Sequence, residues 1–96
     1  MAIKKEPTHV LQDVEQLDAI SKRLKRAHGQ LAAVIRMLDE GRNCDEIVTQ
    51  MAAVNKAVNT AAFTLISTSL KECIVDNKNN NQGVQEKLQK LFLSLA

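Results

Sequence analysis

The chain has very few aromatic residues, with no tryptophan, no tyrosine and only two phenylalanines in 96 residues. Large aromatic side chains anchor many small cores, and they also form the platforms on which bases stack. Their scarcity argues against an aromatic core and against a stacking site for single-stranded nucleic acid. It favours helices that pack on helices through aliphatic side chains.

Long apolar runs are also missing. The opening stretch MAIKKEPTHVLQD contains no apolar segment of the length that a signal peptide needs. Elsewhere no run approaches the roughly 18 apolar residues of a membrane span. We therefore expect a soluble, cytoplasmic protein that does not contact a membrane. Because a single domain of this size has a thin core, we also expect it to oligomerise.

Strand-like alternation, solenoid repeats and phosphate-binding glycine-rich loops are absent from the sequence. Instead, apolar residues recur at alternating steps of three and four between about residues 13 and 41, which predicts a long amphipathic helix. The residues of this seam are Leu17, Ile20, Leu24, Ala27, Leu31, Val34 and Leu38. Gly41 then predicts a tight turn into an antiparallel partner helix, which Asn43 or Asp45 can cap.

The same spacing continues from about residue 45 to 76, which predicts a second long helix with an alanine-rich middle. Its apolar positions are Ile47, Met51, Val54, Val58, Ala61 and Leu65. A polar, asparagine-rich linker over 77–83 and a short apolar-striped helix over 84–95 follow. Residues 1–12, which contain Pro7, are expected to form a flexible tail. The prediction is an all-α fold with a single domain over 13–96.

Two cysteines, Cys44 and Cys73, are the only thiols of the chain. Cytosolic thiols usually stay reduced unless they serve redox, metal or nucleophilic chemistry, although a cysteine can also be a small buried hydrophobic residue. Their separation of 29 residues puts them within about 20° around the second helix but about 43 Å apart along it. They cannot meet within one straight helix. They can meet between antiparallel copies whose two-fold axis crosses near Val58 and Asn59.

Such a pair of thiols has two kinds of chemistry open to it. Two thiolates can bind Cu(I), usually with the help of an imidazole. Alternatively, one thiolate attacks an oxidised sulfur species and the other resolves the product as a disulfide or polysulfide bridge. The only histidines are His9 in the tail and His28 on the first helix. Both are expected to be surface polar residues, so no metal site is expected unless the two cysteines bind Cu(I).

Basic residues are concentrated between Ser21 and Arg42, where six lysines and arginines face only two acidic residues. No acidic residue follows the first four of these cations, Lys22, Arg23, Lys25 and Arg26, at i+3 or i+4. An ordinary solvated helix face usually carries such partners. The run is therefore a candidate phosphate-binding surface, with DNA bound mainly through backbone charge and shape.

Taken together, the basic run, glycine turn, first cysteine and alanine-rich helix resemble the CsoR/RcnR/FrmR family of bacterial repressors. The matching text is RLKRAHGQLAAVIRMLDEGRNCDEIVTQMAAVNKAV, followed by SLKEC. The resemblance implies an antiparallel four-helix-bundle dimer, a dimer of dimers, and a ligand-free form that binds operator DNA. It also implies release of that DNA when an inter-subunit site is modified. The family often has a basic residue where this chain has Asn55. The nearest cation is the adjacent Lys56, which lies about 100° further round the helix, and the resemblance extends the DNA contact to it only by this neighbouring position.

One departure from the family pattern bears on the effector. Copper and nickel or cobalt sensors of the family place a histidine four residues before the position of Cys73, where this chain has Ser69. The formaldehyde sensors also have a proline after the initiator methionine, where this chain has Ala2. The remaining pattern resembles the CstR group, which responds to persulfides and related reactive sulfur without a cofactor.

Three hypotheses follow from the sequence. The first is a repressor that senses reactive sulfur through an inter-subunit pair of Cys44 and Cys73. The second is a Cu(I)-responsive repressor that uses the same two thiolates. The third is a helical interaction module that binds no nucleic acid. An enzyme is not expected, because the predicted fold forms no cleft and brings no histidine within reach of a cysteine.

Overall fold

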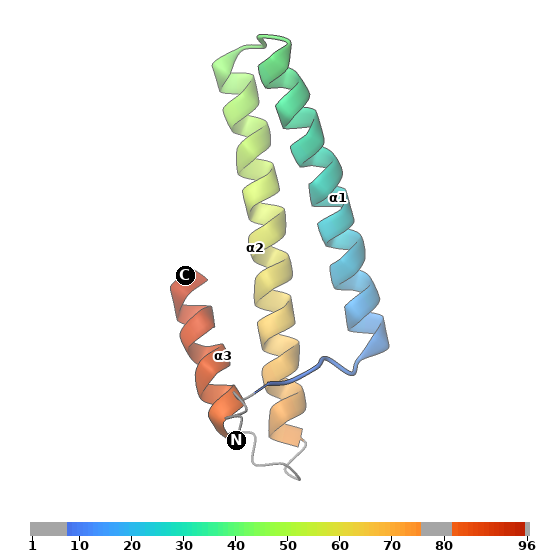
Figure 1. Ribbon diagram of the computed structural model, residues 1–96, viewed down its shortest axis with the longest axis vertical. Coiled ribbons are helices and arrows are strands. Elements are labelled where there is room, and N and C mark those ends of the chain that lie inside the picture. Colours follow the sequence, from blue (N-terminus) through green and yellow to red (C-terminus); the bar gives the residue numbers. More distant parts are fainter. Residues whose placement is uncertain (1–7, 76–81, 96) are drawn as a thin grey trace, which may run out of the picture.

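The computed structural model describes residues 8–75 and 82–95. These residues form three helices, α1 (Val14–Asp39), α2 (Cys44–Val75) and α3 (Gln82–Leu95). Helices α1 and α2 run side by side in opposite directions, and α3 lies along the C-terminal half of α2 (Figure 1). The predicted all-α architecture of two long helices and a short C-terminal one is confirmed.

The helix ends differ slightly from those expected. Helix α1 ends at Asp39 rather than near 41, and α2 begins at Cys44 rather than at 45. Helix α3 begins at Gln82, so the last two positions of the predicted linker belong to the helix. Residue 76, the predicted end of the second helix, lies outside the described residues, as do 77–81 of the predicted linker and 1–7 of the predicted tail. No helix among the described residues is both long and apolar enough to cross a membrane.

The turn between α1 and α2 depends on Gly41, which adopts a φ of 68°. The backbone N–H of Arg42 donates to the carbonyl of Met37 at 3.0 Å, and that of Gly41 donates to Leu38 at 3.2 Å. These two bonds form a Schellman motif, which satisfies the last carbonyls of α1. A left-handed residue at this position favours glycine, so the hairpin turn is encoded locally.

The predicted seams of the two long helices divide into two sets. Ile20, Ala27 and Val34, spaced by seven residues on α1, are at most 6% exposed. On α2, Ile47 and Ala61 are buried as well. The alternate seam positions stay 41–58% exposed, and these are Leu17, Leu24, Leu31 and Leu38 on α1 and Met51, Val58 and Leu65 on α2. One set therefore forms the core of the hairpin, while the other leaves apolar area uncovered.

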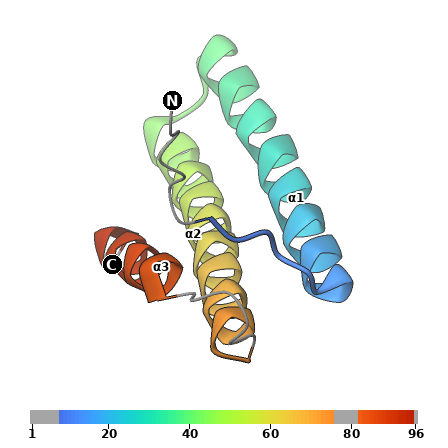
Figure 2. The same cartoon turned by 60° about the horizontal axis from the view of Figure 1, so that its bottom comes forward.

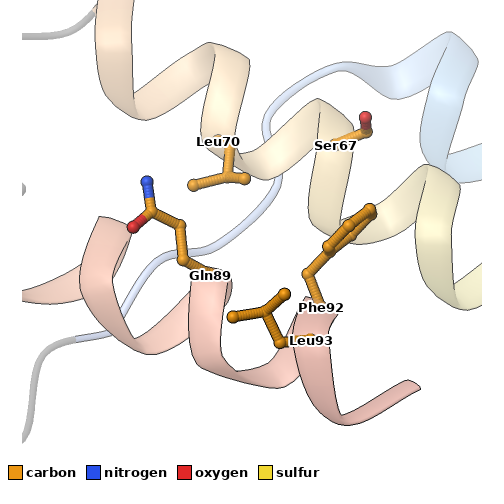
Figure 3. Close-up of a pocket in the computed structure, with 5 residues that line it drawn as sticks. All are labelled: Ser67, Leu70, Gln89, Phe92 and Leu93. Carbon is orange, nitrogen blue, oxygen red and sulfur yellow. The ribbon is translucent and has the colours of Figure 1, made fainter. Parts of the chain in front are cut away.

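Helix α3 is attached to α2 through the only two aromatic side chains. Phe63 and Phe92 meet edge to face, with ring centroids 5.1 Å apart. Val84, near the start of α3, is 7% exposed. A cavity of about 410 Å³ lies between the two helices. Figure 3 shows Ser67 and Leu70 of α2 on one side of it and Gln89, Phe92 and Leu93 of α3 on the other. The apolar stripe of α3 thus docks only in part on its own subunit.

The predicted flexible tail is wrong for residues 8–12. Leu11 is only 7% exposed and forms a buried cluster with Ile20 of α1 and Ala61 of α2. In Figures 1 and 2 this segment crosses α2 from the start of α1 towards α3. Apolar periodicity could not reveal this contact. The segment is held by one apolar side chain, Leu11, and by hydrogen bonds, and neither produces a repeating sequence pattern. We call residues 8–13 the strap.

Candidate DNA-binding and sensing surfaces

Four of the five candidate DNA-binding residues line one groove between α1 and α2. Lys22, Arg23 and Arg26 lie on one side of α1, and Lys56 faces them from α2. The groove encloses about 570 Å³. All four cations are exposed. This basic groove is completed by Ala19, Gln30, Ala53, Ala57 and Thr60. Lys56, the least certain of the sequence candidates, thus lies beside the cations of the first helix.

Lys25 is not part of the basic groove. It lines a separate hollow with His28, Leu17, Leu24 and Leu65. Because successive residues of a helix are about 100° apart, this set occupies the opposite side of α1 from the groove. The sequence placed all four cations of the run on the two flanks of one seam, and the structure separates the flanks into a basic side and an apolar side.

The absence of acidic partners in the basic run needs one correction. Lys22 Nζ lies 2.9 Å from a carboxylate oxygen of Asp18, four residues earlier on α1. The expectation considered only residues that follow each cation, so it missed this pair. Both side chains are more than 60% exposed, and such a surface pair contributes little. Arg42, at the far end of the basic stretch, is engaged by Glu46 and Glu40.

The groove also contains polar residues that sequence reasoning passed over. Gln30 lies one turn after Arg26, and its Oε1 atom is buried without a hydrogen-bond partner among the described residues. A buried carbonyl oxygen without a partner is costly unless a ligand or water satisfies it. The sequence could have indicated this position of Gln30, because Gln30 follows Arg26 by four residues and residues four apart share a helix face.

The half-exposed seam positions gather on the side of the hairpin opposite the basic groove. Leu17 and Leu24 of α1 line one hollow with Leu65 of α2. Leu31, Leu38, Met51 and Val58 continue the same two rows at steps of seven residues. We call these seven residues the apolar face. Monomeric proteins rarely expose an apolar surface this continuous unless it meets a partner.

Three alanines of the alanine-rich middle of α2 contribute to packing or to the groove within the subunit. Ala53 and Ala57 line the basic groove, and Ala61, 1% exposed, is buried against α1 and the strap. The small side chains therefore allow close approach of α1 and the strap within the subunit, while Met51, Val58 and Leu65 occupy the apolar face.

The two cysteines lie at opposite ends of α2. Cys44 is the first residue of the helix and is exposed, whereas Cys73 lies near the other end and is 0% exposed. Both belong to one continuous helix, so the expected separation of about 43 Å holds and they cannot meet within a subunit. No group of three histidine, cysteine, aspartate or glutamate residues that could hold a metal ion occurs within the described part of the chain.

The turn that carries Cys73 is covered by the strap and by α3. Ser69, one turn earlier, is only 6% exposed and lines a cavity of about 240 Å³ with His9 of the strap and Val84 of α3. The expectation that His9 is a surface residue is therefore wrong, since its side chain is 16% exposed. Lys87 lines the same cavity. Nothing in the local sequence around His9 signals this position, because the contact spans more than sixty residues.

Glu72, next to Cys73, binds the strap through three residues. Its carboxylate accepts the backbone N–H groups of Gln12 and Asp13, each at 2.9 Å, and lies 2.9 Å from Nε2 of His9. The N–H of Gln12, followed by the contact with His9, lowers the pKa of Glu72 below its ordinary value. Asp13 in turn caps α1 by accepting the N–H of Gln16. The end of α2 that carries Cys73 is thus tied to the start of α1, which contributes to the basic groove.

The described residues thus form an all-helical hairpin with a basic groove on one side and an uncovered apolar face on the other. Residues 16–94 match the model of a family described as metal-sensitive transcriptional repressors. The chain belongs to this family, and it is a transcriptional repressor rather than an enzyme. Membership implies binding to operator DNA, which sets aside the hypothesis of an interaction module that binds no nucleic acid.

Several curated relatives share this sequence pattern. The copper-sensing transcriptional repressor RicR of Mycobacterium tuberculosis is 35% identical over 60 residues, which are 62% of this chain and 62% of RicR. The copper-sensing repressor CsoR of Bacillus subtilis is 31% identical over 71 residues, covering 74% of this chain and 70% of CsoR. The transcriptional repressor RcnR of Escherichia coli K12 is 35% identical over 68 residues, covering 71% and 72%. No solved structure matches the chain.

Proposed function

We propose that this chain is a repressor that responds to reactive sulfur and releases its operator when Cys44 of one subunit is bridged to Cys73 of another. The observation that carries the proposal is the position of the two thiols relative to the apolar face. Val58 belongs to that face and lies midway between the cysteines along α2. A two-fold axis at this point brings opposite ends of two α2 helices together, and it generates two equivalent sites.

The proposed subunit arrangement is an antiparallel dimer closed by the apolar faces of two hairpins. Seven large apolar side chains that are 41–58% exposed in the subunit would be covered by this contact. Such burial contributes about 25 cal/mol per Å² of apolar area. The result is a four-helix bundle whose basic grooves face outward. Two such dimers are proposed to combine, so that several grooves contact one operator in the cytoplasm.

The proposed chemistry needs only the two thiols and a small persulfide. Cys44 is exposed and takes the terminal sulfur of the persulfide as a thiolate, and the small molecule leaves as a thiol. The thiolate of Cys73 in the facing subunit then attacks Sγ of Cys44, and the bond between Sγ and the transferred sulfur breaks. This step forms an inter-chain disulfide and releases hydrosulfide. The two protein thiols are oxidised, and the transferred sulfur is reduced, so no other oxidant is required.

The serine at position 69 supports sulfur chemistry over metal binding. A histidine at this position would place an imidazole one turn from Cys73, and the hydroxyl of Ser69 is a poor ligand for a soft ion. His9 lies in the same region, but its Nε2 atom is engaged by Glu72 at 2.9 Å. The residues around Cys73 therefore favour a reaction of the two thiols with reactive sulfur over binding of a metal ion.

Cu(I) is the second candidate effector, because RicR and CsoR are copper-sensing repressors and the two thiolates are soft ligands. The test is release of a fluorescent duplex that carries the protein's own promoter, after separate treatment with cysteine persulfide and, under anaerobic conditions, Cu(I). We expect release by the persulfide and none by Cu(I). Release by Cu(I) alone would favour the second candidate.

Cysteine variants complete this test. Cys44→Ala and Cys73→Ala should each bind the promoter as tightly as the parent protein and keep it in the presence of persulfide. If either variant releases the duplex as readily as the parent, the proposed pair is not the sensor. A buffered thiol competitor in the copper arm separates weak surface binding from a specific site.

A further inference from the structure

The strap and its contacts with Glu72 carry an inference about access to the sensor. We propose that the strap acts as a latch over the turn that holds Cys73, so that this thiol becomes reactive only when residues 8–13 leave Glu72. The inference deepens the proposed function, since it concerns what controls one of its two thiols. It rests on three independent features of the described residues.

The first feature is the complete burial of Cys73 inside its own subunit. The residue is 0% exposed, although the proposed bridge needs its sulfur to meet another chain. Cys44, the other member of the pair, is exposed. A buried thiol reacts slowly with external reagents, because the reagent must reach the sulfur and the thiolate must be solvated. The subunit therefore has to open locally before the pair can form.

The second feature shows that the strap is the element best placed to open. It has no helix or strand of its own, and its hold on α2 depends on one carboxylate and one apolar anchor. Glu72 binds the backbone of Gln12 and Asp13 and the ring of His9. Loss of this carboxylate removes all three contacts together. Segments with few buried contacts open at low free energy, so the strap can leave while the hairpin stays folded.

The third feature is the route from the strap to the sensor turn. His9 and Thr8 line the cavity that contains Ser69, one helical turn before Cys73. Val84 of α3 closes another side of this cavity. When the strap leaves, the cavity loses one of its walls next to the turn of the thiol. Because Asp13 also caps α1, the same motion frees the start of the helix that carries Lys22 and Arg23.

The test measures how fast Cys73 reacts with N-ethylmaleimide in the full-length Cys44→Ala protein, where it is the only thiol. Labelling is followed by intact mass. We expect Glu72→Ala to raise the labelling rate at least tenfold. Glu86→Ala removes the same charge from an exposed position on α3 and should leave the rate unchanged. A labelling rate of Glu72→Ala within twofold of the parent rate would overturn the proposal.

A second variant and a second measurement guard against a folding defect. Leu11→Ala removes the apolar anchor of the strap and leaves α2 unaltered, so it should raise the labelling rate as well while circular dichroism keeps its helical signal. In the unsubstituted protein, the amides of Gln12 and Asp13 should exchange with deuterium more slowly than those of an unstructured peptide. Exchange at the peptide rate would contradict the latch.

Neither measurement uses DNA or persulfide, so the two proposals can fail separately. Faster labelling in a protein that never responds to persulfide would support the latch and refute the proposed function. Unchanged labelling in a protein that releases its promoter on persulfide treatment would refute the latch alone.

Discussion

At the scale of single residues, the position of each cation on its helix decides its role. Lys22, Arg23 and Arg26 share one side of α1 with the groove, whereas Lys25, between them in sequence, lies on the other side. Phosphate contacts depend on geometry as well as on charge. Adjacent lysines and arginines of one basic run are therefore not equivalent.

This difference predicts unequal effects on DNA binding. Arg23→Ala should weaken binding to the promoter duplex about tenfold, and it should reduce the slope of log K against log salt by about one, because one phosphate contact is lost. Lys25→Ala removes one positive charge from the apolar side and should change the slope by much less. Fluorescence anisotropy over a salt series measures both. Equal losses for the two variants would contradict the placement of the DNA surface in the groove.

How much could be foreseen from the sequence differs among these residues. The cations, the cysteines and the turn glycine follow from local spacing, since helix periodicity places them. His9 meets Glu72 across 63 residues, and Leu11 meets Ala61 across 50 residues, and no local pattern encodes these contacts. Burial of Cys73 also escapes the sequence, because two cysteines on one helix look alike until other segments are packed over one of them.

At the scale of elements, the hairpin is determined by its two long helices and by the turn that joins them. The periodicity predicted the helices, and Gly41 with its φ of 68° ends α1. Each long helix has two sets of apolar positions, and periodicity could not predict which set packs against the neighbouring helix and which set faces outward. On α1 both sets repeat every seven residues. Only the packing of α2 against Ile20, Ala27 and Val34 distinguishes the buried set from the exposed one.

The two described glycines of the hairpin give opposite predictions for the same substitution. Gly41→Ala should destabilise the protein by about 1 kcal/mol, because alanine disfavours a positive φ. Gly29→Ala should stabilise it by about 0.5–1 kcal/mol, since Gly29 lies inside α1 and a methyl group there contacts nothing within 4 Å. Urea unfolding at a fixed protein concentration measures both. A loss of stability from Gly29→Ala would show that its side of α1 is covered in the assembled protein.

At the scale of the whole molecule, a single subunit leaves its apolar face uncovered and keeps its two cysteines at opposite ends of α2. Its extents of 54 × 32 × 26 Å describe an elongated body with little interior. Small domains of this kind often gain stability through association. The proposed dimer covers the apolar face and brings each exposed Cys44 to the end of the facing α2. Assembly and sensing are thus proposed to depend on the same surface.

The apolar face yields a prediction about assembly. Val58→Glu places two carboxylates together at the proposed two-fold axis, so the dimer should dissociate at least tenfold more readily. Ala53→Glu introduces the same charge into the basic groove, where it should weaken DNA binding and leave the dimer intact. Sedimentation velocity over a concentration series measures both. A Val58→Glu protein that stays dimeric would refute this interface.

The most direct measurement of the central claim is the intact mass of the persulfide-treated protein without reductant. We predict a covalent species with twice the mass of one chain, formed by the parent protein and also by an equimolar mixture of Cys44→Ala and Cys73→Ala chains that have exchanged subunits. Either variant treated alone should form no species with twice the mass of one chain, although Cys73→Ala can retain an added sulfur on Cys44. A linked species formed by one variant alone, or sulfur addition without any inter-chain link in the parent, would contradict the pairing of Cys44 with Cys73 across subunits.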